Sequence, residues 1–220
     1  MIILQRILCL VIGYAFGLIQ TAYIIGKTKH VDIREYGSGN SGTTNAMRTL
    51  GKKAGIITFL VDGLKAVAAT VLVRLIFPDS DYILVLVLYT GVGVVLGHNF
   101  PFYMGFKGGK GIAASGGVIL SCFDIKLLLC ALVTFAVVAL ISRYVSLGSL
   151  CIMAGFVIEL IVFGELGMMS EVSGFNKGYN IETYLIAIFM AVLAFIRHKE
   201  NIKRLINGTE RKIGEKKEAL

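Results

Sequence analysis

The chain has 220 residues, of which 56% are hydrophobic, with a mean hydropathy of +0.78 and a formal net charge of +8. The length fits a single domain over residues 1–220, but this much apolar sequence exceeds what one soluble core can bury, which excludes an ordinary soluble globular protein. Outside the apolar stretches there is no recognition helix or aromatic-basic platform, so nucleic-acid binding is not expected.

Apolar stretches follow one another along the chain, and most approach the roughly 20 residues that a helix needs to cross hydrocarbon. Six of them cover residues 3–25, 54–77, 82–96, 125–141, 147–163 and 181–196. A seventh, residues 111–123, is short and rich in small residues, so it is expected to be either a span or a buried half-span or re-entrant helix. The first stretch is too long for a signal peptide and no A-x-A-like site follows it, so we expect it to be retained. These patterns predict an all-α integral membrane protein.

Lysine and arginine are distributed unevenly between the connections. When seven spans are threaded, one face receives 17 of the 22 Lys and Arg residues, in loops 26–53, 98–110 and 142–146 and in the segment 197–220. The positive-inside rule then places the N-terminus outside, the C-terminus in the cytoplasm and the glycine-rich loops on the cytoplasmic side, with residues 207–220 as a basic cytoplasmic tail. Six spans would divide the polar clusters between the faces, so we predict seven transmembrane helices.

The first polar cluster, residues 37–48, reads GSGNSGTTNAMR. Glycines let backbone N–H groups close around an anion, hydroxyl and amide groups bond phosphate oxygens, and an arginine one helical turn later adds a planar fork. The candidate residues are Ser38, Gly39, Asn40, Gly42, Thr44, Asn45 and Arg48. The alternative is a plain glycine turn between helices. The cluster also fits G-x-G-x-x-G, but a dinucleotide site needs a preceding strand, and Asp62 at the expected spacing lies in an apolar helix, where we predict an ion pair with Lys65.

The second polar cluster, residues 97–111, reads GHNFPFYMGFKGGKG. Lys107 and Lys110 flank Gly108 and Gly109, which places two point charges beside exposed backbone donors, an arrangement that suits a dianionic phosphate. It is not a Walker A loop, because Gly111 follows Lys110 where Ser or Thr is required. Alternatively, both lysines are interfacial anchors that reach toward lipid headgroups.

The third polar cluster, residues 197–212, reads RHKENIKRLINGTERK and begins where the last span ends. His198 and Asn201 are three residues apart and share a helical face, so the histidine can accept a proton and the asparagine can donate to developing charge. The alternative is a basic juxtamembrane helix with an incidental histidine. Glu210 is predicted to hold the basic residues together by ion pairing. Paired carboxylates for two metals, H-E-x-x-H, G-x-S-x-G and H-x-x-x-x-D are all missing from the sequence.

Together these three clusters closely resemble the signatures of the bacterial acyl-phosphate:glycerol-3-phosphate acyltransferase family, an integral membrane enzyme of phospholipid synthesis. The match covers most of the chain and also includes residues 143–147, RYVSL, in which Ser146 can bond glycerol phosphate. Departures are minor: Gly63 and the Ala114-Ser115 pair differ from the family pattern and affect helix packing more than chemistry.

The resemblance implies that the 1-hydroxyl of glycerol 3-phosphate attacks acyl phosphate, giving lysophosphatidic acid and inorganic phosphate without a metal, coenzyme A or other cofactor. It implies a multi-pass protein of the bacterial cytoplasmic (inner) membrane, in contact with lipid, with its active site on the cytoplasmic face. The first cluster is expected to hold acyl phosphate, and Lys107, Gly108, Gly109, Lys110 and Gly111 glycerol phosphate, or the reverse. The expected catalytic residues are Ser38, Arg48, His198 and Asn201, and the base is either His198 or the departing phosphate. A transporter of phosphorylated solutes is the alternative function, and a metal-dependent lipid phosphotransferase lacks the aspartates it needs.

Overall fold

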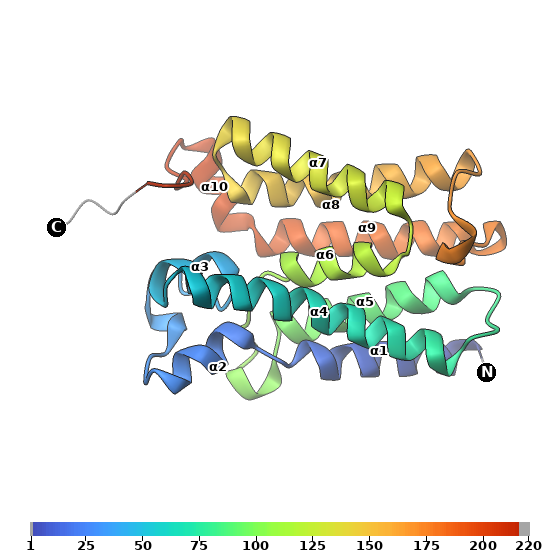
Figure 1. Cartoon of the computed structure of the whole chain (residues 1–220), viewed down its shortest axis with the longest axis horizontal. Coiled ribbons are helices and arrows are strands. Elements are labelled where there is room, and N and C mark those ends of the chain that lie inside the picture. The colour runs from blue at the N-terminus through green and yellow to red at the C-terminus, as the bar shows by residue number, and fades with distance from the viewer. Residues whose placement is uncertain (1, 216–220) are drawn as a thin grey trace.

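The computed structural model describes residues 2–215, and within them the chain forms a bundle of α-helices joined by short loops and 3-10 turns (Figure 1). The α-helices are α1 (Ile2–Gly17), α2 (Thr21–Thr28), α3 (Thr43–Thr49), α4 (Lys52–Ile76), α5 (Ile83–Asn99), α6 (Ile112–Ser121), α7 (Ile125–Ser142), α8 (Val145–Glu165), α9 (Asn180–Arg197) and α10 (Lys199–Ile206). The 3-10 turns are η1 (Ile33–Glu35), η2 (Phe102–Met104), η3 (Glu171–Ser173) and η4 (Lys177–Tyr179). The prediction of an all-helical fold is confirmed. Lys216 and Lys217 of the predicted tail lie outside the described residues.

Six helical segments among the described residues are long and apolar enough to cross a membrane, and they coincide with the six long stretches of the sequence. They are Ile2–Thr28, which combines α1 and α2, then Lys52–Ile76, Ile83–Met104, Ile125–Ser142, Val145–Glu165 and Lys177–Arg197. The small-residue stretch forms α6, which has only 10 residues. At a rise of 1.5 Å per residue, α6 is about 15 Å long, half the thickness of a hydrocarbon core.

Although it is short, α6 carries the chain through the middle of the bundle, away from the end that carries α10 (Figure 1). It begins at Gly111, which lies against the side chain of Asn99 at the end of α5. It ends at Ser121, whose carbonyl accepts a hydrogen bond of 3.2 Å from Arg74. Arg74 also donates to the carbonyl of Ser173 in the α8–α9 connection, so the last turn of α6 faces the end of the bundle opposite α10. Gly117 of α6 packs so closely on the Gly63 carbonyl of α4 that a methyl group would collide there.

Glycines bring α1 and α5 into close contact. Gly13 and Gly17 on α1 face Gly93 and Gly97 on α5, and a methyl group at any of the four would collide with backbone of the other helix. Small residues spaced by four let two membrane helices approach this closely, because their backbones then meet without intervening side chains. The contact fixes the last turn of α5, which ends in His98 and Asn99, beside the break between α1 and α2.

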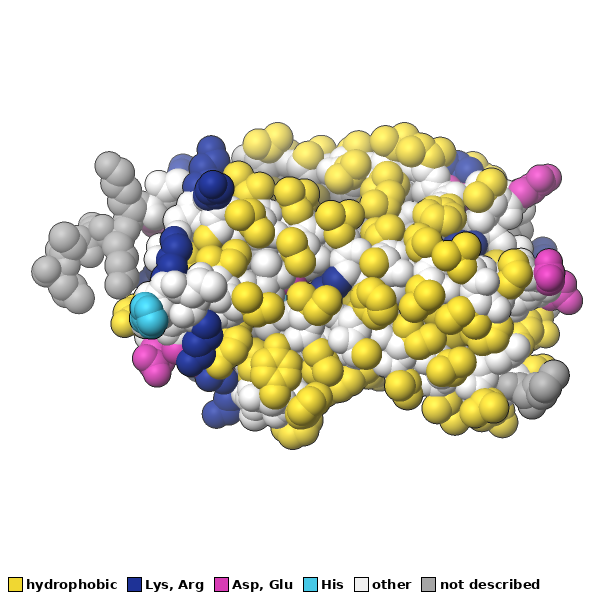
Figure 2. Space-filling view, turned by 60° about the horizontal axis from the view of Figure 1, so that its bottom comes forward, with side chains coloured by type: hydrophobic (Ala, Val, Ile, Leu, Met, Phe, Trp, Pro, Cys, Tyr) yellow, Lys and Arg dark blue, Asp and Glu magenta, His cyan; other side chains and the backbone are white. Residues whose placement is uncertain are grey.

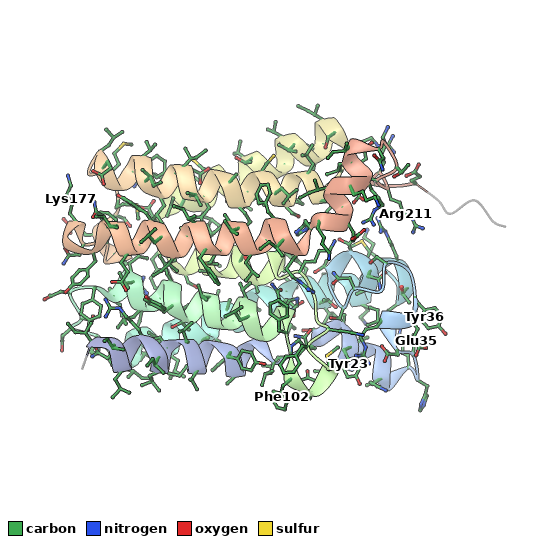
Figure 3. The ribbon with its side chains drawn as sticks, turned by 180° about the vertical axis from the view of Figure 1, so that it is seen from behind. Tyr23, Glu35, Tyr36, Phe102, Lys177 and Arg211 are labelled. Carbon is green, nitrogen blue, oxygen red and sulfur yellow. The ribbon has the colours of Figure 1, made fainter. Side chains whose placement is uncertain are left out.

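The surface divides into an apolar middle and two polar ends (Figure 2). Hydrophobic side chains cover the middle, and several are largely exposed, including Leu75, Leu140 and Ile141. Lys and Arg gather at the end that carries α10, while Asp and Glu are prominent at the other end. Arg211, Tyr36 and Glu35 all lie at the basic end, and Lys177 lies at the opposite end (Figure 3). This pattern is that of a multi-pass membrane protein whose basic loops share one face.

Candidate active site

The second and third clusters of the sequence meet at the basic end of the bundle. Lys110 donates a hydrogen bond from Nζ to Oδ1 of Asn201, which comes from α10. Arg197, at the end of α9, donates to the carbonyls of Gly108 and Gly109 at 3.3 and 3.0 Å, and its guanidinium stacks 5.0 Å from the ring centre of Phe100. The loop between α5 and α6, called here the glycine-lysine loop (residues 100–111), is therefore braced by the end of α9.

The first cluster reaches the same place through Gln20, which lies in the break between α1 and α2. The amide of Gln20 donates to the carbonyls of His98 and Gly97 at 3.0 and 3.3 Å. Its oxygen accepts a hydrogen bond of 3.3 Å from the hydroxyl of Ser41. Arg48, in the last turn of α3, lies within the electrostatic reach of Arg204 and Glu210. The three clusters, far apart in the sequence, thus form one site.

The first loop is shaped from within by Asn45. Its Oδ1 accepts from the backbone N–H of Ser38 at 2.9 Å, and its Nδ2 donates to the carbonyls of Ile33 and Tyr36 at 3.1 and 3.0 Å. Both donors of the buried amide are used, so Asn45 folds the loop. Positive φ angles of 64° and 68° at Gly37 and Gly39 complete the turn, which suits residues without a side chain.

The other predicted residues of the first loop remain open toward solvent. Ser38, Gly39, Thr44 and Arg48 are exposed, and Asn40 and Gly42 are half-buried. Gly42 precedes the first turn of α3, so backbone N–H groups of the loop and of the helix start are adjacent. The loop therefore presents hydroxyls, backbone N–H groups and one guanidinium on the same surface.

The glycine-lysine loop rests directly on the end of α5. The N–H groups of Gly108 and Gly109 donate to the carbonyls of Asn99 and His98 at 3.1 and 3.0 Å, and neither glycine has room for a side chain. Gly111 starts α6 with a φ of 82°. Lys107 is exposed, whereas Lys110 extends into the site.

The ammonium group of Lys110 loses its proton at a lower pH than an ordinary lysine does. Burial lowers the pKa of Lys110 to about 8; Glu210 opposes this shift, whereas the positive charges of Arg204, Arg197 and Arg48 add to it. Binding of an anion next to Lys110 would stabilise its ammonium form against these neighbouring positive charges. The site is thus electrostatically prepared for a negatively charged ligand.

His198 connects α9 to α10, and its side chain is almost fully buried. Nδ1 lies 2.8 Å from the carbonyl of Ala194, which can only accept, so Nδ1 carries the hydrogen and Nε2 is left as the acceptor. Burial, together with the charge of Lys110, lowers the pKa of His198 to about 4. The imidazole is therefore neutral at neutral pH.

Glu210 joins the remaining polar groups of the site. Its carboxylate accepts from Asn201 at 2.6 Å and from Ser146 at 2.8 Å, and it pairs with Arg204 at 2.7 Å. Burial alone would raise the pKa of Glu210, but these hydrogen bonds and Arg204 keep it below its usual value. The predicted ion pairing by Glu210 is confirmed, and it brings Ser146 from α8 into the cluster.

Three residues of the site were missed by sequence reasoning as contributors: Gln20, Asn99 and Arg197. Gln20 is an amide inside an apolar run, and such a residue in a span is itself a functional signal. Asn99 is fully buried, yet neither of its side-chain polar atoms has a hydrogen-bond partner among residues 2–215. A buried amide normally pairs, so this one is conspicuous.

Comparison with known proteins identifies the family. Residues 7–208 match the family model described as glycerol-3-phosphate acyltransferase. The chain belongs to the glycerol-3-phosphate acyltransferase family. This acyltransferase family includes a relative from Clostridioides difficile that is 41% identical across 98% of this chain and 99% of its own, and one from Alkaliphilus metalliredigens that is 38% identical across 96% and 97%.

Solved structures of the acyltransferase family agree with the fold. The crystal structure of PlsY, an integral membrane glycerol 3-phosphate acyltransferase in its glycerol 3-phosphate form, superposes with a TM-score of 0.80 at 34% identity, covering 95% of this chain and 96% of that one. The lysophosphatidic acid form superposes with a TM-score of 0.77 at 33% identity. The resemblance drawn from the three motifs is confirmed, and the chain is a multi-pass membrane protein of this family.

Proposed function

We propose that this protein transfers an acyl group from acyl phosphate to the 1-hydroxyl of glycerol 3-phosphate. The hydroxyl oxygen attacks the carbonyl carbon, the bond from that carbon to the phosphate oxygen breaks, and lysophosphatidic acid and inorganic phosphate are formed. The observation that carries this proposal is the convergence of three hydrogen-bonded clusters around Arg48, Lys110, Arg197 and Arg204. Relatives that bear the acyltransferase name, and PlsY structures with glycerol 3-phosphate and with lysophosphatidic acid, support it.

For this reaction the protein must mainly bring two anions, acyl phosphate and glycerol 3-phosphate, together. A mixed anhydride is already activated and phosphate leaves readily, so positioning and charge stabilisation supply most of the catalysis. In this proposal the first loop holds acyl phosphate through Ser38, Asn40 and Thr44, with Arg48 as its fork. The glycine-lysine loop and Ser146 hold glycerol 3-phosphate, with Lys110 and Asn201 nearest the reacting atoms.

The hydroxyl proton has two candidate acceptors. Nε2 of His198 is one, since Nδ1 is already committed to Ala194. The departing phosphate is the other, and it needs no protein base. A pKa near 4 makes His198 a weak acceptor, but two bound phosphates would raise that pKa by stabilising the imidazolium.

Purified protein incubated with palmitoyl phosphate and glycerol 3-phosphate tests the reaction. We expect release of inorganic phosphate together with lysophosphatidic acid, insensitive to EDTA. Flux of glycerol 3-phosphate into liposomes without product would instead identify a transporter. Activity abolished by EDTA would identify a metal-dependent enzyme.

We also propose that the protein lies in the bacterial inner membrane with its N-terminus outside and the site on the cytoplasmic face, using six long spans and the short α6 as a seventh crossing. The concentration of Lys and Arg at the end with the site supports this orientation. Thiol labelling of single cysteines placed at Ser80 and at Asn207 tests it. Labelling of Asn207→Cys from outside intact cells would contradict the proposed orientation.

Arg48→Lys is expected to lower kcat/KM for acyl phosphate by about tenfold, because lysine is a point charge and cannot form the two parallel bonds of a guanidinium fork. Steady-state kinetics with acyl phosphate varied at saturating glycerol 3-phosphate measure the loss. Wild-type kinetics in this variant would show that Arg48 does not hold the phosphate as a fork.

Asn99→Leu is expected to leave the unfolding temperature in detergent unchanged or higher, since leucine has a similar shape and removes a buried amide that lacks a partner. We propose that this amide bonds to glycerol 3-phosphate, so kcat/KM for glycerol 3-phosphate is expected to fall by about tenfold, as for the loss of one hydrogen bond to a charged ligand. Unchanged kinetics would show that the amide of Asn99 does not contact substrate.

A further inference from the structure

Three ionisable side chains form a continuous chain of contacts inside the membrane-spanning part of the bundle. Lys65 on α4 lies 2.9 Å from the carboxylate of Asp62, which confirms the intrahelical pair expected from the sequence. On its other side, Nζ of Lys65 lies 2.8 Å from Nδ1 of His98 on α5. Thr21 adds a hydrogen bond of 3.1 Å to Asp62, and all four residues are buried.

Lys65 also holds the break between α1 and α2. Its ammonium donates to the carbonyl of Ile19 at 2.6 Å and lies 3.5 Å from that of Gly17, which also accepts a hydrogen bond of 3.3 Å from the amide of Gln20. Both carbonyls lie where α1 ends, so they have no helical backbone partner. An ammonium has only donors, so Nδ1 of His98 must accept from it and Nε2 must carry the hydrogen. Lys65 therefore fixes both the tautomer and the orientation of the His98 ring.

The fixed ring lies directly under the glycine-lysine loop. A methyl group on Gly109 would collide with Nε2 of His98, and the backbone N–H of Gly109 donates to the His98 carbonyl at 3.0 Å. The next residue, Lys110, bonds to Asn201. Three steps thus lead from the buried ion pair to the cation that reaches into the site.

We propose that Asp62, Lys65 and His98 are positioning residues. They fix how closely the backbone of Gly109 packs on the end of α5, and through Gly109 they fix the position of Lys110. Buried charges in a membrane span are costly, and apolar residues of similar size often hold helices together equally well. What apolar residues cannot supply is a fixed imidazole orientation. This inference rests on the proposed role of the glycine-lysine loop in holding glycerol 3-phosphate.

A double-mutant cycle between Gly109 and Lys65 tests the network. In the wild-type background, the methyl group added by Gly109→Ala collides with the His98 ring, which Lys65 holds in place, so the loop must move. KM for glycerol 3-phosphate is then expected to rise at least about tenfold, and kcat is expected to fall by a smaller factor. In the Lys65→Met background the ring can turn aside. There Gly109→Ala is expected to raise KM by less than about threefold beyond the effect of Lys65→Met itself.

His98→Asn provides a second, independent route. Asparagine keeps an acceptor near the place of Nδ1 but lacks the ring edge that faces Gly109. The double variant His98→Asn/Gly109→Ala is therefore expected to have a lower KM than Gly109→Ala alone. A rescue of this kind would not arise from general destabilisation, and it keeps the test valid if Lys65→Met does not fold.

Two matched controls separate the network from unspecific effects. Arg6→Met removes a cation outside the network, because Arg6 on α1 pairs with Glu182 on α9. The effect of Arg6→Met on KM is expected to be independent of, and therefore additive with, that of Gly109→Ala. Gly116→Ala adds a methyl group to α6 with nothing within 4 Å, and it is expected to be silent in every background.

Additive effects of Gly109→Ala with both Lys65→Met and His98→Asn would overturn the network. The role of the loop itself is tested separately by variants of Lys110. A normal KM for glycerol 3-phosphate in Lys110→Met would overturn the loop's proposed role in binding, whereas non-additivity of Gly109 with Lys65 would still support the structural coupling between them.

Discussion

Lys110→Met is expected to lower kcat/KM for glycerol 3-phosphate by about a hundredfold, because hydrogen bonds to charged groups contribute up to about 3 kcal/mol when their partner is lost. Lys110 is the group through which the glycine-lysine loop contacts α10, so the change also leaves Asn201 without its donor. Lys107→Met is the matched control. Lys107 is exposed, its charge is screened by solvent, and its loss is expected to cost only severalfold.

The pH dependence of the same parameter gives a second readout for Lys110. Its pKa of about 8 means that the ammonium is present below pH 8 and is lost as the pH rises through that value. kcat/KM for glycerol 3-phosphate should therefore fall by about tenfold per pH unit above pH 8. Lys110→Arg should remove this fall, since an arginine keeps its proton throughout the range.

Glu210→Gln should shift the fall to lower pH. Glu210 raises the pKa of Lys110, so without the carboxylate the ammonium loses its proton more easily. A wild-type profile that stays flat to pH 10 would contradict the assignment of Lys110 as the titrating group.

His198→Gln is expected to lower kcat by about a hundredfold, the smaller end of the range for a lost general base. KM for either substrate should change by less than about threefold, because glutamine can replace a hydrogen bond near Nε2 but cannot accept the hydroxyl proton. Steady-state and single-turnover kinetics with both substrates varied measure the two parameters. The exposed His30, changed to Gln, is the control and should leave kcat as it is.

An unchanged kcat in His198→Gln would eliminate this histidine as the base and leave the departing phosphate in that role.

The helices and the site clusters were predictable from the sequence because each depends on a local signal. A run of apolar residues long enough to cross hydrocarbon has few other structures available, so six long helices were expected where they occur. The three clusters were recognisable because glycine, lysine and hydroxyl residues are rare inside such a chain. Their assembly at one end followed from counting crossings and positive charges.

Roles within the clusters depend on contacts between distant residues, and the sequence does not encode these locally. Asn45 shares the composition of an anion site, yet its hydrogen bonds fold the first loop. From the sequence, Gly108 and Gly109 are expected to give the loop flexible backbone. In the structure they are needed because a side chain at Gly108 would collide with the backbone of α5, and one at Gly109 with the ring of His98. The sequence did not decide whether residues 111–123 span the membrane. The hydropathy of a ten-residue helix does not determine its position in the bundle, which depends on the helices that pack against it.

The carboxylate of Glu210 acts as a built-in counter-ion for the cations of the site. Without it, several like charges would repel one another across the site, and any small anion could neutralise them. Ser146, Asn201 and Arg204 already bind the carboxylate of Glu210, so another anion must compete with that carboxylate to bind them. We expect a doubly charged phosphate ester to compete with Glu210 better than a singly charged ion such as chloride or acetate, so the carboxylate favours the binding of phosphate esters.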